Sequence, residues 1–357
     1  MKKIGIGIIG YGFMGHEHMT MLRGLDKFSV VGVYDIDPSQ LRDVPEGVKV
    51  YSSNEELLAD PAIDVALIVV NNNQHLALVE QAARAGKDII CEKPVALTVD
   101  DLDRMVKTVD ECGVRFTVHQ QRRYDLDYRT MKAVYDSGRL GKVYSIKSSL
   151  YGFNGNMHDW HVYLSEGGGM LYDWGVHLLD QILWMMPGAK IRTVYADLRN
   201  VINFEVDDYF KVIMRFDNGT VAEVELGTYF LTDKVEQKWF ERHWMVCGDK
   251  ACAYSDGFDP DGKIVSTTKL LTNVGGKRTM TAAGPTRSFG PPADGTLVSE
   301  PLEKATTSHA DFFENYWRAY NGEEEFLVKI TETRRVLRLM DAVRESAKTG
   351  ESVRFEW

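Results

Sequence analysis

The fold is decided by residues 4–15, which read Ile-Gly-Ile-Gly-Ile-Ile-Gly-Tyr-Gly-Phe-Met-Gly. The apolar residues up to Ile9 predict a buried strand, and a G-x-G-x-x-G pattern begins directly after it. Apolar residues at helical spacing follow, and a second apolar run over residues 28–34 ends at Asp35, twenty residues after Gly15. This order of strand, glycine-rich turn, helix, strand and acid predicts a dinucleotide-binding unit.

Each residue of the glycine-rich turn has a physical task in such a unit. Gly10 allows the tight turn, Gly12 lets the backbone approach a pyrophosphate, and Gly15 lets the helix pack against the strand. The start of the helix offers free backbone N–H groups and a partial positive charge to the phosphates. We therefore expect a dinucleotide to be bound at Gly10, Gly12, Phe13, Met14 and Gly15.

Asp35 indicates which dinucleotide is bound. A carboxylate at the end of the second strand accepts hydrogen bonds from the ribose hydroxyls and repels a 2′-phosphate. Residues 36–40 add a second acid, Asp37, and contain no Arg or Lys. The sequence therefore favours NAD over NADP as the cofactor.

Length and charge limit the class of protein. The chain has 357 residues, which suggests two domains at roughly 150 residues each. A net charge of −10 disfavours nucleic acid or an anionic membrane as a partner. The sequence shows no signal peptide and no apolar run of about 18 residues, so we expect a cytoplasmic protein that does not span a membrane. Four cysteines without a C-x-x-C motif are expected to be reduced thiols.

Two different patterns divide the chain near residue 121. Up to that point strands alternate with helices, which predicts an α/β domain at residues 1–121 with a doubly wound parallel sheet, the Rossmann arrangement. Residues 122–357 are richer in strands with hairpin turns, such as Asp217-Asn218-Gly219. They predict an α+β domain with an antiparallel sheet, interrupted by a helix over residues 171–186.

Polar residues follow two of the expected Rossmann strands. Asn71, Asn73 and His75 come after the strand at 63–70, and Glu92 and Lys93 come after the strand at 88–91. Ligands of open α/β sheets bind at the carboxyl ends of the strands. We therefore expect these five residues to contact the cofactor, with Lys93 held at the crevice by the stiff proline that follows it.

A second group of reactive residues lies in the C-terminal half. Gly167-Gly168-Gly169 leads into the expected helix, which carries Asp173 and His177 four residues apart and hence on one face. A carboxylate beside an imidazole suits a general base, although spacing alone is equally consistent with a structural pair. A metal site built from His158, His161, Asp173 and His177 is the less favoured alternative, and we expect no metal.

At this point the motifs resemble one family. The G-x-G-x-x-G turn, Asp35, Glu92-Lys93-Pro94, Gly168-Gly169 and Asp173-x-x-x-His177 together resemble the glucose–fructose oxidoreductase/inositol dehydrogenase (Gfo/Idh/MocA) family over the whole chain. The resemblance implies a C-terminal domain with a large, mostly antiparallel sheet that often forms the interface of a dimer or tetramer. It also implies hydride transfer between nicotinamide and a secondary alcohol of a sugar, glycoside or cyclitol. Asn71-Asn72 departs from the Thr-Pro that relatives often carry, which affects the nicotinamide contact.

The resemblance assigns catalytic roles to three residues. His177 takes the proton of the substrate hydroxyl, Lys93 stabilises the charge on that oxygen, and Asp173 orients the pair. Two other functions stay open. One is a redox-neutral glycosidase that oxidises a sugar carbon transiently and eliminates the aglycone. The other is a nicotinamide-binding sensor without catalysis, which the retention of all three residues disfavours.

Substrate selection is expected in two further stretches. The first, Arg122-Arg123-Tyr124, follows the last Rossmann strand and faces the domain cleft. The second, residues 151–161, is dense in aromatic rings and hydrogen-bonding groups that suit a small polyhydroxy substrate. The expected contacts are Arg122, Arg123, Tyr124, Asn154, His158, Asp159 and Trp160. Because only the two arginines suggest a phosphate pocket, an unphosphorylated sugar or glycoside is favoured.

Overall fold

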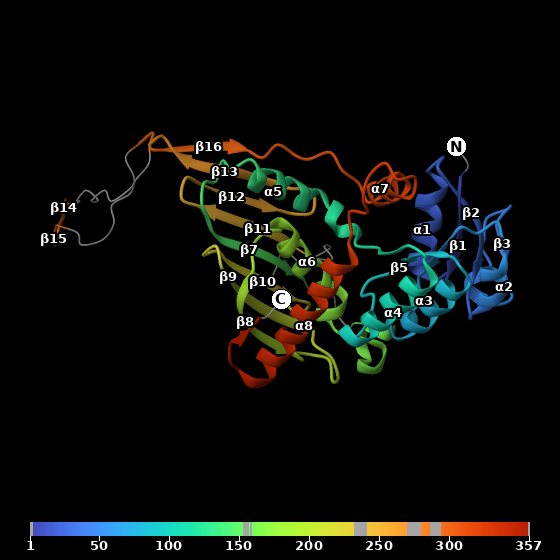
Figure 1. The fold of residues 1–357 in the computed structure, drawn as a ribbon. Coiled ribbons are helices and arrows are strands. Elements are labelled where there is room, and N and C mark those ends of the chain that lie inside the picture. The colour runs from blue at the N-terminus through green and yellow to red at the C-terminus, as the bar shows by residue number, and fades with distance from the viewer. Residues whose placement is uncertain are drawn as a thin grey trace.

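The computed structural model describes residues 3–152, 157, 159–231, 241–269, 280–285 and 294–355. The expected contacts Asn154 and His158 therefore lie outside the described residues. Figure 1 shows two domains side by side, with the N-terminal domain at one end and a large sheet at the other. Among the described residues, no helix is long and apolar enough to cross a membrane.

The N-terminal domain is a parallel six-stranded sheet in the order β3-β2-β1-β4-β5-β6. This order confirms the predicted Rossmann fold, and the chain changes direction across the sheet between β1 and β4. The strands are β1 (Ile4–Ile9), β2 (Phe28–Tyr34), β3 (Lys49–Val50), β4 (Val65–Ile68), β5 (Asp88–Cys91) and β6 (Phe116–Val118). The helices are α1 (Phe13–Arg23), α2 (Asn54–Ala59), α3 (His75–Arg84) and α4 (Val99–Cys112).

Local signals place the helices of this domain. Ser53 Oγ accepts a hydrogen bond from the Glu56 N–H at 3.1 Å and so caps α2, as the sequence predicts. Thr98 caps α4 in the same way through the Asp101 N–H, and Gly113 ends that helix in the left-handed conformation. All six residues of β1 are buried, because helices cover both faces of the sheet.

The C-terminal domain is built on a nine-stranded sheet in the order β16-β13-β12-β11-β7-β10-β9-β8-β17. Among the described strands only β7 and β10 pair in parallel, so the sheet is mostly antiparallel, as predicted. The strands are β7 (Val143–Tyr151), β8 (Ile191–Arg199), β9 (Tyr209–Phe216), β10 (Val221–Gly227), β11 (Glu241–Gly248), β12 (Ala251–Asp256), β13 (Asp261–Thr267), β16 (Leu297–Pro301) and β17 (Val353–Arg354). A separate small hairpin joins β14 (Met280–Thr281) to β15 (Gly284–Pro285).

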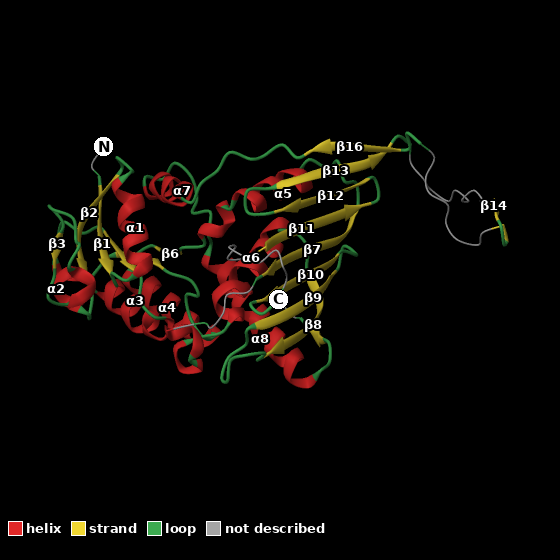
Figure 2. Cartoon of the chain, turned by 180° about the vertical axis from the view of Figure 1, so that it is seen from behind, coloured by secondary structure: helices red, strands yellow, loops and turns green. Residues whose placement is uncertain are grey.

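Three helices cover one face of this sheet, the face toward the Rossmann domain. They are α5 (Leu126–Asp136), α6 (Val176–Met185) and α8 (Ile330–Thr349), which Figure 2 shows between the sheet and the N-terminal domain. Side chains alternate between buried and accessible along β9 and β11, which is expected of a sheet covered on one face. The opposite face of the sheet carries the accessible set.

Helix α7 (Ala310–Tyr320) packs against the Rossmann domain although it lies far along the chain. Its Phe313 ring makes an edge contact with Phe28 at a centroid distance of 5.7 Å, and its Glu314 pairs with Lys27. A division at residue 121 therefore assigns α7 to the C-terminal part by sequence, whereas the helix contributes to the packing of the N-terminal domain.

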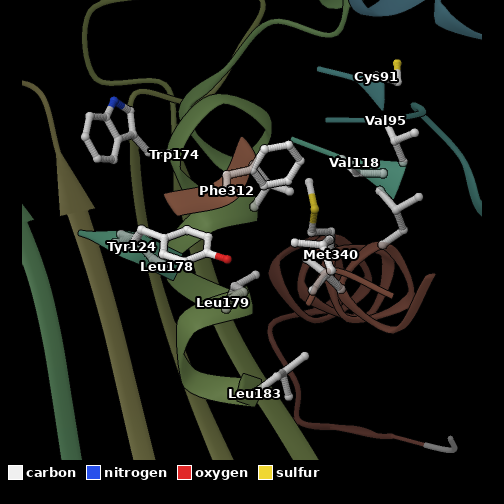
Figure 3. Close-up of a cluster of buried hydrophobic side chains, with 14 of the residues drawn as sticks. Cys91, Val95, Val118, Tyr124, Trp174, Leu178, Leu179, Leu183, Phe312 and Met340 are labelled. Atoms are coloured by element: carbon white, nitrogen blue, oxygen red, sulfur yellow. The ribbon is translucent and has the colours of Figure 1, made fainter. Parts of the chain in front are cut away.

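The two domains share a continuous apolar core. Figure 3 shows Cys91, Val95 and Val118 of the Rossmann domain facing Met340 of α8 and Phe312 of α7, with Leu178 and Leu179 of α6 close by. Leu179, Val118 and Met340 are fully buried. Burying apolar side chains between the domains holds the carboxyl ends of β5 and β6 against α6.

Candidate active site

The glycine-rich turn has the geometry expected of a pyrophosphate site. Gly10 has a φ of +93°, and a Cβ there would lie 2.1 Å from the Val69 carbonyl oxygen. A Cβ on Gly15 would lie 2.5 Å from the Gly10 oxygen, so α1 packs directly on the turn. Gly12, in contrast, faces open space at the start of α1 and makes no side-chain capping hydrogen bond. The first N–H groups of α1 are therefore available to an anion.

The next two residues of this turn differ in exposure. The Phe13 side chain is 79% exposed in the first turn of α1, whereas Met14 is half-buried. Both lie at the helix end that the pyrophosphate would approach.

Asp35 lies at the carboxyl end of β2, next to the same turn. Its Oδ2 accepts a hydrogen bond from the Tyr11 N–H at 2.6 Å, and its Oδ1 accepts one from the Asp37 N–H at 2.8 Å. These contacts fix the carboxylate beside the glycine turn. Each carboxylate oxygen has a second acceptor position, so the half-buried group can still receive ribose hydroxyls.

The turn after β4 joins the two domains. Asn71 Nδ2 donates to Glu166 Oε2, and Asn72 Nδ2 donates to the Gly167 oxygen, both at 3.1 Å. Asn73 is exposed. His75 is fully buried, and its two ring nitrogens lie 3.0 Å from the Pro94 and Val70 oxygens. The His75 side chain therefore braces the loops after β4 and β5, and its expected contact with the cofactor stays a prediction.

Lys93 connects the Rossmann domain to the helix of the second domain. Its Nζ lies 2.7 Å from Asp173 Oδ1 and 3.0 Å from the Asp173 backbone oxygen. The side chains of Lys93 and Asp173 are 14% and 17% exposed. Burial favours the neutral form of Asp173, but Lys93 and then His161 outweigh it, so the pKa of Asp173 lies below its ordinary value. The Asp173 carboxyl group is therefore ionised at neutral pH.

The helix that carries Asp173 and His177 is not a regular α-helix. Its first turn, η6 (Leu171–Gly175), is π-helical, and α6 begins only at Val176. π-helical turns inside α-helices are rare and are often found at functional sites. Asp173 bonds to Lys93 across the domains, and its other oxygen lies 3.7 Å from His161 Nε2. The expected Asp173–His177 pair on one face is therefore replaced by an Asp173–Lys93 pair.

His177 is a buried and neutral imidazole. Burial, and then the positive charges of Lys93 and Arg122, hold the pKa of His177 well below its ordinary value. Its ring lies edge-on to Trp174 at a centroid distance of 6.2 Å, and its Nδ1 has no hydrogen-bond partner among the described residues. An imidazole in this state can accept a proton at neutral pH.

Glu92 forms a buried cluster that sequence reasoning missed. Its Oε1 accepts hydrogen bonds from His18 Nε2 at 2.7 Å and His119 Nδ1 at 2.8 Å, and its Oε2 accepts the Lys93 N–H at 3.1 Å. Burial opposes ionisation of Glu92, but His119 and His18 outweigh it and keep its pKa well below the ordinary value. Glu92 thus holds the Lys93 backbone from within the core, and its expected contact with the cofactor stays a prediction.

The same cluster is the candidate metal group in the described part of the chain. Its contacts have hydrogen-bond lengths, and burial lowers the pKa of His119 to about 4, which indicates a neutral imidazole donating to the carboxylate. Hydrogen bonding therefore accounts for the cluster without an ion. Of the four side chains weighed for zinc in the sequence, His161 and Asp173 lie near each other, and His158 is outside the described residues.

The expected substrate contacts separate into two groups. Arg123 is 1% exposed and is bound by Asp180 and Glu332, and Tyr124 is 5% exposed, with burial raising its pKa to about 12. Figure 3 shows Tyr124 directed toward the interdomain core. Both side chains are buried in the protein, and their expected contact with the substrate stays a prediction. Arg122, in contrast, lies beside the site, with its guanidinium carbon 3.9 Å from the Trp174 ring centroid.

Trp160 and Asp159 lie on the loop before the glycines. The Trp160 ring stacks on His161 at a centroid distance of 3.9 Å, and His161 in turn lies beside Asp173. Asp159 is exposed and has a φ of +53°. Trp160 and His161 therefore form an aromatic surface next to the ion pair.

Comparison with known proteins agrees with this geometry. Residues 4–120 match the model of an oxidoreductase family with an NAD-binding Rossmann fold, GFO_IDH_MocA, and residues 128–254 match the GFO/IDH/MocA C-terminal domain. The chain belongs to this family. It is thus an NAD-binding oxidoreductase of the Gfo/Idh/MocA family.

Similar proteins include one solved structure with full coverage. An NAD-binding protein from Listeria innocua is 32% identical, with a TM-score of 0.89 over 99% of this chain and 100% of that chain. The myo-inositol 2-dehydrogenase of Thermotoga maritima is 27% identical over 76% of this chain and 79% of its own. The 2,7-anhydro-N-acetylneuraminate hydratase of Mediterraneibacter gnavus is 26% identical over 74% of this chain and 70% of its own.

Proposed function

We propose that this member of the Gfo/Idh/MocA family transfers a hydride between NAD and a secondary alcohol of a sugar, glycoside or cyclitol. The observation that carries the proposal is the meeting of Lys93 and Asp173 at 2.7 Å, where the carboxyl end of β5 faces the second domain. A neutral His177 follows on the same helix as Asp173. A cation, its counter-ion and a neutral base on neighbouring elements suit removal of an alcohol proton.

The three residues divide the proton chemistry between them. An ammonium has three N–H donors, and the two contacts to Asp173 leave one for a substrate oxygen. Lys93 therefore stabilises negative charge on that oxygen, while His177 accepts its proton. Asp173 holds the ammonium in place. NAD supplies the hydride acceptor when it is bound.

NAD is proposed over NADP because of Asp35. The carboxylate is fixed by the N–H groups of Tyr11 and Asp37 at the end of β2. A ribose hydroxyl can donate a hydrogen bond to this carboxylate. A 2′-phosphate would be repelled by its negative charge, and the two hydrogen bonds keep the carboxylate from rotating away.

We also propose that the open face of the nine-stranded sheet forms a homo-oligomer interface. Tyr195, Met245 and Tyr254 are 42%, 43% and 36% exposed on that face, opposite the helices. Exposed large side chains on a broad flat sheet are typical of a self-association surface. The dimer or tetramer can be determined from the mass of the protein in solution.

A redox-neutral reaction is the second candidate, because one relative is named as a hydratase. The test is a panel of sugars, cyclitols and glycosides incubated with NAD, with NADH formation and product release followed together. Net NADH in step with product supports the dehydrogenase. Product without net NADH supports the redox-neutral reaction. If no compound is converted and no hydride moves, the proposed function is wrong.

A further inference from the structure

Two neighbouring arginines at the end of β6 have different surroundings. Arg123 uses one edge of its guanidinium in a two-point contact, with Nε and Nη2 each 2.7 Å from an oxygen of Asp180. Its Nη1 donates to Glu332 and to the Leu327 oxygen. Arg123 is therefore occupied by groups of its own chain.

In Arg122 the corresponding edge, formed by Nε and Nη2, is not bound to a carboxylate of the described residues. Its Nη1 donates to Asp125 Oδ2 at 3.2 Å, and among the described residues its Nε and Nη2 have no hydrogen-bond partner. Asp125 is shared, since its Oδ1 lies 2.7 Å from His309 Nε2. The Arg122 side chain is 23% exposed, so it is not enclosed by the protein as Arg123 is.

The position of Arg122 is fixed at the catalytic helix. Its guanidinium carbon lies 3.9 Å from the Trp174 ring centroid and 5.8 Å from that of Phe258, and Gln181 Nε2 donates to its backbone oxygen at 2.8 Å. Trp174 directly follows Asp173, and its ring lies near His177. Stacking holds one face of the planar guanidinium and leaves its edge for hydrogen bonds in the plane.

We propose that the free edge of Arg122 binds a carboxylate of the substrate, so that the substrate is an acidic sugar such as a uronic acid. This inference rests on the proposed function and narrows its substrate class. Two parallel N–H donors match the two oxygens of a carboxylate. A phosphate ester carries more oxygens and more negative charge than one guanidinium edge can neutralise. The other cation at the site, Lys93, is already paired with Asp173 and does not supply the missing charge.

The test compares acids with their neutral counterparts. The values of kcat/KM with NAD are measured for glucuronate, glucose, galacturonate, galactose and glucose 6-phosphate. We expect each uronate to exceed its neutral sugar by at least about 10-fold, and Arg122→Gln to reduce that ratio by about 10- to 100-fold, as expected for a charge-assisted contact. Arg122→Lys keeps the charge without the paired donors and should give an intermediate ratio.

Arg104→Gln is the matched control, since Arg104 is an exposed guanidinium on α4 and 3.5 Å from Glu80. It should leave the ratio unchanged. Calorimetric binding of glucuronate and glucose to the enzyme–NADH complex gives a readout that does not need turnover.

Equal affinity for the acid and the neutral sugar, or equal losses for both in Arg122→Gln, would overturn the inference. A preference for the phosphate ester would overturn it in favour of a phosphate site. Absence of hydride transfer with selective uronate binding would instead count against the proposed reaction.

Discussion

The substitution Asp173→Asn tests how much the ion pair with Lys93 contributes to the stability of the folded protein. The substitution keeps the size of the side chain and removes its charge, which leaves the Lys93 ammonium with the Asp173 backbone oxygen at 3.0 Å. Removing one partner of a buried pair typically costs about 3–5 kcal/mol. Both side chains are less than one-fifth exposed, and the backbone contact remains. We therefore expect a loss of about 2–3 kcal/mol in unfolding free energy, or roughly 3–4 °C in Tm for a chain of this length.

The assay is thermal and urea unfolding of the parent, Asp173→Asn, Lys93→Met and the double variant. Removing both charges leaves no unpaired ion, so the double variant should be more stable than Asp173→Asn alone. If Asp173→Asn unfolds like the parent, or if the double variant is as unstable as this single variant, the charges are not coupled as the structure indicates.

The pH dependence of this difference has a definite sign. Burial raises the pKa of Asp173 in the folded protein, but the positive charges of Lys93 and then His161 outweigh burial, so the pKa is lowered. The unfolded chain therefore binds more protons in acid, and the stabilisation is present above the unfolded pKa of about 3.9. It is lost as pH falls through the lower folded pKa. The parent and Asp173→Asn should converge in stability below about pH 4.

Three further outcomes are expected. The parent should use NAD at least about 10-fold more efficiently than NADP, and Asp35→Asn should narrow this ratio of kcat/KM values; equal use of both cofactors by the parent contradicts the role of Asp35. Prolonged treatment with a chelator should leave activity unchanged, and a stoichiometric metal whose removal abolishes activity would show that the Asp173 site needs an ion. Because the pKa of His177 lies well below its ordinary value, the rate of hydride transfer should show no acid limb near pH 6.5; a limb centred there contradicts a neutral buried base.

Local sequence rules were sufficient for the Rossmann domain. The glycine turn at residues 10–15 and the cap at Ser53 depend on neighbours a few residues away, and the structure has both of them as predicted. The large antiparallel sheet was predicted from its hairpin turns and from the family resemblance, and it too is confirmed.

The features of the site that the sequence did not reveal arise from long-range contacts. His18, Glu92 and His119 are brought together by three separate elements, so spacing in the sequence could not reveal their cluster. Arg123 and Arg122 are neighbours with the same side chain, and only the position of Asp180 on α6 decides which of them is occupied. The π-helical turn at residues 171–175 has no reliable local signal, and the contact of Asp173 with Lys93 joins residues eighty positions apart.

The most direct test of the catalytic assignment is hydride transfer in a single turnover at saturating NAD, measured beside an NADH titration. Lys93→Met and His177→Ala should each slow transfer by at least about 10²-fold, and the double variant should be little slower than either. Lys107→Met, which removes an exposed lysine of α4, is the control and should match the parent. NADH affinity should stay within about threefold in all variants, since neither residue belongs to the glycine turn or to Asp35, where the phosphates and the ribose are expected to bind. Near-parental hydride transfer in Lys93→Met or His177→Ala, or a loss explained by failure to bind the cofactor, would contradict the assignment.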